Sequence, residues 1–390
     1  MLLAVLACAP SRGAGGPPPA LRELAAARGI GIGVAVAAHA LRGDSLYRRT
    51  LAREFGLVTT ENALKFEPLR PAPDRWEFGD ADTIVAFAER HGMRVRGHTL
   101  VWKRQLPCWL TEGADSGAAL AALLREHIRT VVGRYRGRIA VWDVVNEPLA
   151  NQITADTPPD SLLRPTLWLK RLGPEHIELA FRWAHEADPG ARLFLNETGA
   201  EAEGPKADAL YELLRDLLAR GVPVHGVGLQ MHLKLRRPAD TESVLRNMRR
   251  LASLGLEVQV TEMEVELARA PGDIREQLDG QARLYREVLA ACLAVPRCTA
   301  FVMWGMTDRY TWQDPDTPLL FDAEYRPKPA YDAVRALLES PGLRSRRRRR
   351  AGARPAPRPP GTPRHGAPVR RPAGGARSCG ADRPRRAGLP

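Results

Sequence analysis

The feature that most constrains this chain is a repeated alternation of short apolar runs with longer amphipathic stretches. Eight apolar runs of strand length can be marked, and the first covers residues 29–36. The other seven end near Glu61, His98, Glu147, Asn196, Gln230, Glu262 and Trp304. Helical spacing of apolar residues is found at 21–28, 43–53, 80–91, 117–135, 175–187, 206–220, 239–253, 278–292 and 328–339.

Eight strands that each precede a helix predict an α/β protein, a (β/α)8 TIM barrel. We place this catalytic domain at residues 20–343. The alternative is an open, doubly wound sheet, whose functional residues gather at one switch point. Here polar and aromatic residues follow nearly every apolar run, which favours the barrel.

The fourth and seventh runs end in glutamates that could act as a pair. The run Ile139-Ala140-Val141-Trp142 leads into Asn146-Glu147-Pro148, and the proline must end the strand because it cannot donate to a sheet ladder. A second carboxylate, Glu262, follows the apolar run 258–261. Catalytic groups of a barrel sit at the carboxyl ends of its strands, and a pair of carboxylates is the machinery of glycoside hydrolysis.

The remaining strand ends carry side chains suited to sugars, which have apolar faces and hydroxyl rims. These are Glu61, Asn62 and Lys65 after the second run, His98 and Trp102 after the third, Gln230 and His232 after the sixth, and Trp304 and Trp312 at and after the eighth. Each has a plainer interpretation, since tryptophan is more often a core residue and a buried histidine is more often merely hydrogen-bonded. The interpretation as a sugar cleft rests on their joint recurrence at strand ends.

The net charge of +13 comes from the C-terminal segment. Residues 344–390 hold 15 arginines and one acid, which leaves 43 basic and 44 acidic residues in the rest of the chain. The catalytic domain therefore gives no reason to expect nucleic-acid binding. We predict that 344–390 is a disordered Arg/Pro-rich tail, and the alternative is a polyanion-binding segment.

The N-terminal residues 1–19 are predicted to be the remnant of an export signal followed by a Gly/Pro-rich linker. We therefore expect a secreted protein. The stretch Val5-Leu6-Ala7-Cys8 resembles a bacterial lipoprotein cleavage site, which suggests a lipid anchor at Cys8. No apolar run approaches the roughly 20 residues of a membrane span. Cys292 and Cys298 are close enough to form a disulfide, and the alternative is two free buried thiols.

The chain resembles the endo-1,4-β-xylanases of glycoside hydrolase family 10 over about residues 20 to 340. The matching stretches are 60–66 (TENALKF), 96–102 (RGHTLVW), 142–147 (WDVVNE), 228–232 (GLQMH), 261–262 (TE) and 304–308 (WGMTD). The resemblance implies hydrolysis of internal β-1,4-xylosidic bonds of xylan and binding of xylo-oligosaccharides, without a metal or cofactor. It also supports a Cys292–Cys298 bridge, and we expect a monomer.

The resemblance implies a role for each site residue. Glu147 would be the general acid/base and Glu262 the nucleophile of a retaining, double-displacement reaction. Asn146, His232 and Glu264 would support them, and the glycone sugars would be bound by Glu61, Asn62, Lys65, His98, Trp102, Gln230, Trp304 and Trp312. We expect the charge of Glu262 to raise the pKa of Glu147, so that Glu147 starts protonated.

Three positions differ from the family pattern. Glu264 stands where the family usually has an aspartate that supports the histidine, and Thr198 replaces a tyrosine near the leaving-group sugar. Met231 is bulkier than the usual residue, so it is expected to crowd the cleft. The competing functions are a barrel glycosidase for another β-glycan or a xylosylated glycoside, and a non-catalytic carbohydrate-binding protein.

Overall fold

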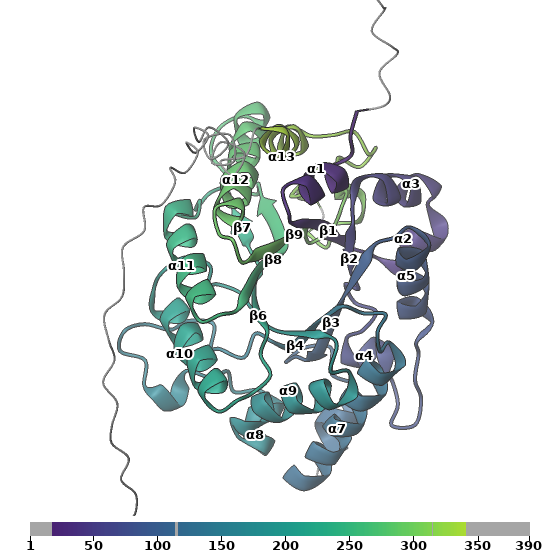
Figure 1. Ribbon diagram of the computed structural model, residues 1–390, viewed down its shortest axis with the longest axis vertical. Helices are drawn as coiled ribbons and strands as arrows, with labels where there is room; N and C mark the ends of the chain where they lie inside the picture. The colour runs from purple at the N-terminus through teal and green to yellow at the C-terminus, as the bar shows by residue number, and fades with distance from the viewer. Residues whose placement is uncertain (1–17, 114–115, 314, 341–390) are drawn as a thin grey trace, which may run out of the picture. The chain divides into compact units, whose positions relative to one another are not determined.

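The computed structural model describes residues 18–113, 116–313 and 315–340. Eight parallel strands form a closed barrel that is surrounded by helices (Figure 1). The barrel strands are β1 Gly31–Ala35, β2 Leu57–Thr59, β3 Arg94–Val101, β4 Val141–Asn146, β5 Arg192–Glu197, β6 Gly226–Leu229, β8 Glu257–Glu266 and β9 Cys298–Met303. Because β1 pairs with β9 and β6 pairs with β8, the ring closes, and the predicted (β/α)8 TIM barrel is confirmed.

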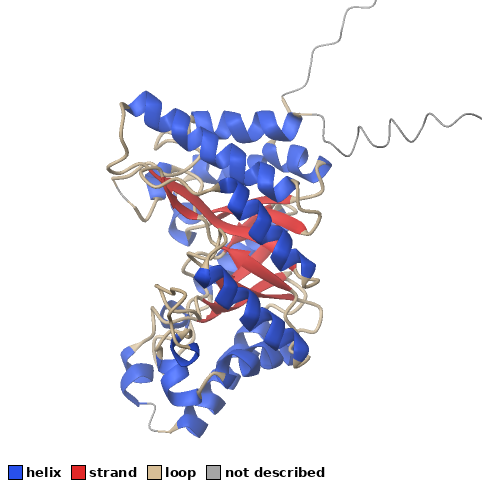
Figure 2. Cartoon of the chain, turned by 90° about the vertical axis from the view of Figure 1, so that its left-hand side faces the viewer, coloured by secondary structure: helices blue, strands red, loops and turns tan. Residues whose placement is uncertain are grey.

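The helices pack as an outer layer around the strands, as the side view shows (Figure 2). They are α1 Leu21–Ala27, α2 Ala38–Gly43, α3 Ser45–Glu54, α4 Phe66–Leu69, α5 Gly79–Arg90, α6 Cys108–Gly113, α7 Gly117–Arg134, α8 Leu167–Leu172, α9 Glu175–Ala187, α10 Pro205–Ala219, α11 Thr241–Ser253, α12 Ile274–Leu293 and α13 Pro329–Glu339, with 3-10 turns at Pro159–Ser161 and Asp308–Tyr310. Every predicted helix coincides with one of these, with ends that differ by a few residues.

Helix α12 illustrates how the sequence sets these boundaries. The Asp273 side chain accepts a hydrogen bond from the backbone N–H of Glu276 at 3.0 Å, and the Glu276 carboxylate accepts one from the N–H of Asp273 at 3.0 Å. This capping box satisfies backbone donors that the first helical turn leaves free. One face of the helix, including Leu284, Val288 and Leu289, is then buried against the barrel.

Two strands continue beyond the residues at which we predicted their ends. His98 lies inside β3, which runs to Val101, and Glu262 lies inside β8, which runs to Glu266. The strand register shifts between His98 and Val101 in β3 and between Val260 and Met263 in β8, so each ladder is interrupted without ending. The extension of β8 is paired with a short additional strand, β7 (His232–Lys234), in which His232 lies opposite Glu264.

A charged cluster fills part of the barrel interior. Arg96 is fully buried and forms a two-pronged ion pair with Asp143, which is 1% exposed. The Arg96 guanidinium also donates to Gln259 Oε1 at 2.6 Å, across the barrel, and His98 Nδ1 lies 3.0 Å from Asp143 Oδ2. This cluster joins β3, β4 and β8 just below the predicted site.

The structure contains a disulfide between Cys292 and Cys298, with an S–S distance of 2.07 Å, as predicted. No helix among the described residues is long and apolar enough to cross a membrane. The predicted export segment, Cys8 and the basic tail 344–390 lie outside the described residues. Export, lipidation, the monomeric state and the domain boundaries therefore stay predictions.

Removal of Asp143 tests the importance of the interior ion pair. We expect Asp143→Ala to lower the free energy of unfolding by about 3–5 kcal/mol, because Arg96 would be left buried without a counter-ion. Urea unfolding followed by circular dichroism measures this change. The control is Asp216→Ala, which removes an exposed partner of Arg220 and should cost under about 1 kcal/mol. Equal losses of unfolding free energy in the two variants would contradict the prediction that buried Arg96 depends on Asp143 as its counter-ion.

Candidate active site

A single cleft of about 1120 Å³ lies at the carboxyl ends of the strands. It brings together every predicted site residue except Glu264, which is buried behind His232. The cleft is lined by Glu61, Asn62, Lys65, His98, Trp102, Asn146, Glu147, Gln230, His232, Glu262, Trp304 and Trp312, among others. Residues from distant parts of the chain meet here because the barrel places all strand ends on one rim.

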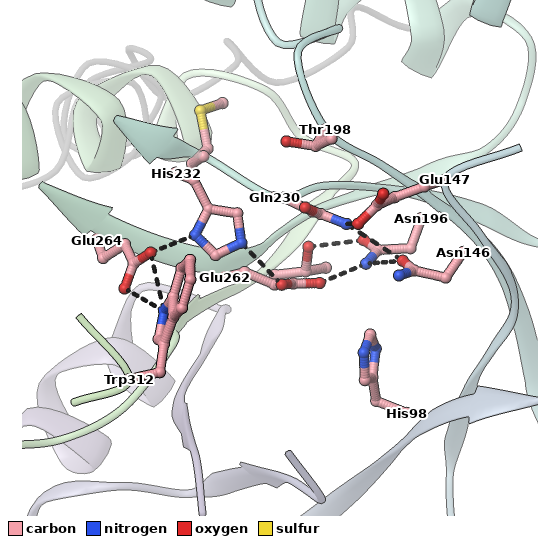
Figure 3. A network of polar contacts seen from close by, with 12 residues as sticks. His98, Asn146, Glu147, Asn196, Thr198, Gln230, His232, Glu262, Glu264 and Trp312 are labelled. Carbon is pink, nitrogen blue, oxygen red and sulfur yellow. Dashed lines mark hydrogen bonds and ion pairs between the residues drawn. The ribbon is translucent and has the colours of Figure 1, made fainter. Parts of the chain in front are cut away.

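Glu262 is held by neighbours on both of its carboxylate oxygens. The Asn196 Nδ2 group donates to Oε1 at 2.6 Å, and His232 Nε2 lies 3.0 Å from Oε2 (Figure 3). The side chain is largely buried, with 4% of its residue surface exposed. These contacts fix the carboxylate in one orientation.

His232 lies between two carboxylates. Its Nδ1 atom is 2.5 Å from Glu264 Oε1, on the side opposite Glu262. Burial alone would lower the pKa of His232, but the hydrogen bonds and charges of Glu262 and Glu264 outweigh it and raise that pKa to about 10. His232 is therefore an imidazolium at neutral pH, donating to both carboxylates.

Glu264 reaches more partners than the histidine. Its carboxylate also accepts a hydrogen bond from Trp312 Nε1 at 3.2 Å (Figure 3). A further hydrogen bond comes from Gln313 Nε2 at 2.5 Å. Trp312 belongs to the long loop after β9 and is 62% exposed. The long glutamate side chain thus supports His232 and also ties this loop to the floor of the cleft.

A series of amide side chains connects the two glutamates. Asn196 Nδ2 donates to Asn146 Oδ1 at 2.9 Å as well as to Glu262. Gln230 Nε2 lies 3.2 Å from Asn146 Oδ1 and 3.4 Å from Glu147 Oε1. We had marked Asn196 only as a strand end. Its position, level with Asn146 on the neighbouring strand, was the available signal that it belongs to the site.

Glu147 is in a different electrostatic environment from the one we predicted. Burial would raise the pKa of its carboxyl, but the ammonium of Lys103 and the guanidinium of Arg164 outweigh that effect and hold the pKa below its usual value. The prediction of a raised pKa is therefore wrong for this state of the protein. It considered only Glu262, whose charge is offset by the His232 imidazolium.

Aromatic and polar groups line the cleft on the side of β2 and β3. Lys65 Nζ donates to Asn62 Oδ1 at 2.8 Å and lies 4.8 Å from the ring centre of Trp102 and 5.7 Å from that of Trp304. Asn62 in turn donates to Glu61 Oε1 at 3.1 Å. These contacts hold a charged, hydrogen-bonding group between two aromatic faces, which is a suitable lining for a sugar.

The prediction that Met231 crowds the cleft is wrong. Its side chain is fully buried in the hydrophobic core, and the residue adopts a left-handed backbone conformation with φ of 65°. Glu61 and Glu147 also have positive φ, at 40° and 52°. Such conformations are costly for residues other than glycine and persist where the surrounding structure holds them.

Thr198 lines the cleft at the position where the family usually has a tyrosine.

Comparisons with known proteins agree with this geometry. The sequence model of "Glycosyl hydrolase family 10" matches residues 20–337. The chain belongs to glycosyl hydrolase family 10. The predicted family, and with it the prediction of a glycoside-hydrolysing enzyme, is confirmed.

Individual members of the family are similar over most of the domain. Endo-1,4-beta-xylanase B of Thermotoga neapolitana is 37% identical over 346 residues, which cover 87% of this chain and 96% of that protein. Xylanase 10B of Thermotoga petrophila, solved with xylobiose, is 38% identical, with a TM-score of 0.78 and coverage of 84% and 99%. TsXylA of Thermoanaerobacterium saccharolyticum, described as an intracellular xylanase, is 36% identical, with a TM-score of 0.74 and coverage of 82% and 99%.

Replacement of Glu264 tests the charge balance around His232. In Glu264→Gln the pKa of His232 should fall from about 10 by about 1–3 units, because one of its two carboxylate partners becomes neutral. Titration of the imidazole by NMR measures the change. Glu266→Gln, on the same strand but paired with Lys234 and Arg236, is the control and should leave His232 unchanged. An unaltered titration in Glu264→Gln would contradict the assignment.

Proposed function

We propose that this protein is a retaining endo-1,4-β-xylanase. The observation that carries the proposal is the pair of glutamates, Glu147 and Glu262, which project from two strands into one cleft and are linked by Asn196, Asn146 and Gln230. The choice of xylan is supported by family membership and by the xylobiose bound to the related Thermotoga petrophila enzyme.

In the first step, Glu262 would attack the anomeric carbon. Its position suits this role because the His232 imidazolium and the Asn196 amide hold its carboxylate in one orientation. Glu147 would give its proton to the glycosidic oxygen as the carbon–oxygen bond breaks. The product of this step is a glycosyl ester of Glu262 and a free leaving-group sugar.

In the second step, Glu147 would act as a base. It would take a proton from water while the water oxygen attacks the anomeric carbon and releases Glu262. The cations beside Glu147 favour its ionised form, which this step requires. Asn146, which accepts from both Asn196 and Gln230, is placed to contact a hydroxyl of the reacting sugar.

Glycone sugars would be held by the lining on the β2, β3 and β9 side of the cleft. Trp102 and Trp304 offer aromatic faces, and Lys65 and Asn62 offer hydrogen bonds between them. Glu61, His98, Gln230 and Trp312 complete this set of binding residues. A non-catalytic carbohydrate-binding protein would have no need of the Glu264–His232–Glu262 arrangement, which holds one carboxylate in a fixed orientation in the cleft.

Reducing-sugar release from xylan, cellulose and mannan tests the proposal. We expect strong release from xylan, and a loss of more than about 10⁴-fold in Glu262→Ala, because that variant has no nucleophile. The matched control is Glu257→Ala, at the opposite end of the same strand, where the carboxylate pairs with Arg192. Preferred release from another glycan, or no release by the folded protein, would overturn the proposal.

A further inference from the structure

Lys103 occupies a position in the cleft that the proposed mechanism does not use. It follows β3 by two residues, and its ammonium forms an ion pair with Glu147 Oε2. The pair is partly buried, since the side chains of Lys103 and Glu147 are 17% and 12% exposed. A pair this sheltered is screened much less by solvent than a pair on the surface.

The charged groups that face Glu147 come from several elements. Arg164, from the loop after β4, places Nη2 at 3.7 Å from the same carboxylate oxygen. Lys65, from the exit of β2, is attracted by Glu147 as well as by Glu61 and Glu262. Arg104 lies beside Lys103 on the cleft rim, and Glu262 faces Glu147 from β8 with its charge balanced by His232. The surroundings of Glu147 are thus cationic overall.

The donors around Glu147 oppose its protonated form. Oε2 faces Lys103 and Arg164, whose charged groups are donors only. Oε1 faces the Nε2 amide donor of Gln230 at 3.4 Å. A proton on either oxygen would therefore meet a hydrogen-bond donor instead of an acceptor. The geometry stabilises the carboxylate and penalises the acid.

Lys103 and Arg164 differ in how firmly they are held. Arg164 donates through Nε to the backbone oxygen of Glu147 at 3.1 Å and through Nη1 to Asn151 Oδ1 at 2.6 Å. The Lys103 ammonium has Glu147 as its one hydrogen-bond partner among the residues described. Among the described residues, the Lys103 ammonium is therefore held in place by Glu147 alone, whereas Arg164 has other partners.

We propose that Lys103 is a positioning residue that keeps Glu147 ionised and so sets how acidic the medium must be before Glu147 can donate a proton. Its kinetic consequence rests on the proposed function. When Glu147 acts as an acid, its O–H bond breaks and the proton passes to the glycosidic oxygen, so a counter-ion that favours the carboxylate opposes this step. The same counter-ion favours the step in which ionised Glu147 accepts a proton from water.

The lowered pKa of Glu147 agrees with this geometry. Burial by itself would raise the pKa of Glu147, and Lys103 is the group that lowers this pKa most. Removal of the ammonium should therefore raise the pKa and move the alkaline limit of activity to higher pH. The alkaline limb of kcat/KM reports the essential acid of the free enzyme.

The test compares charge-removing and charge-retaining variants of the full chain. Lys103→Met and Lys103→Gln remove the charge, Lys103→Arg retains it, and Lys234→Met removes another cleft lysine that is paired with a glutamate, Glu266. The Glu147 carboxyl is titrated by ¹³C NMR, with its signal identified by its absence in Glu147→Gln. The pH dependence of kcat/KM on xylo-oligosaccharides is measured in parallel, and circular dichroism identifies which variants fold.

We expect the Glu147 titration and the alkaline limb of kcat/KM to move up by about 1–3 pH units in Lys103→Met and Lys103→Gln. In Lys103→Arg and Lys234→Met, the Glu147 titration and the alkaline limb of kcat/KM should stay where they are in the unaltered protein. A Glu147 titration that is unchanged in the folded charge-removing variants, or shifted equally in Lys103→Arg, would overturn the inference. If the titration shifts but the unaltered protein hydrolyses no xylan, the role of Lys103 stands and the proposed function fails.

Discussion

All eight barrel strands run in the same direction, and everything in the cleft depends on this constraint. Parallel pairing around a closed ring brings the carboxyl end of each strand to one rim, so residues more than 100 positions apart in the sequence become neighbours. Asn146 and Asn196 lie level on adjacent strands because β4 pairs with β5 in that register. The contact between Asn196 and Glu262 follows from the same arrangement.

The two glutamates are held by different groups. Glu262 has a cationic partner, His232, which is itself held by Glu264 behind it. Glu147 has Lys103 and Arg164 on one oxygen and no carboxylate in direct contact among the described residues. The position of each carboxylate therefore depends on separate groups. The Glu264 side chain also connects His232 to the Trp312 loop.

The sequence was sufficient for the barrel, for the approximate positions of the predicted helices and for many of the residues that meet in the cleft. Alternating apolar runs and caps such as Asp273–Glu276 are local signals, because they do not depend on contacts with distant parts of the chain. The side-chain direction of Lys103 is not a local signal, and the pKa of Glu147 was therefore predicted with the wrong sign. Met231 was misjudged because its buried side chain depends on a left-handed backbone that nothing in the sequence marks. The ends of β3 and β8 were misplaced because the pairing with β4, β7 and β9 decides where those strands stop.

The central claim is that Glu262 forms a covalent bond to the substrate. Incubation with a 2-deoxy-2-fluoro-xylobioside that carries a good leaving group should trap the glycosyl-enzyme. The fluorine slows both steps, and the good leaving group keeps formation of the glycosyl-enzyme faster than its hydrolysis. Mass spectrometry of the digested protein should then find one added xylobiosyl unit on the peptide that contains Glu262. A label on another carboxylate, or no adduct together with an inverted product, would contradict the account.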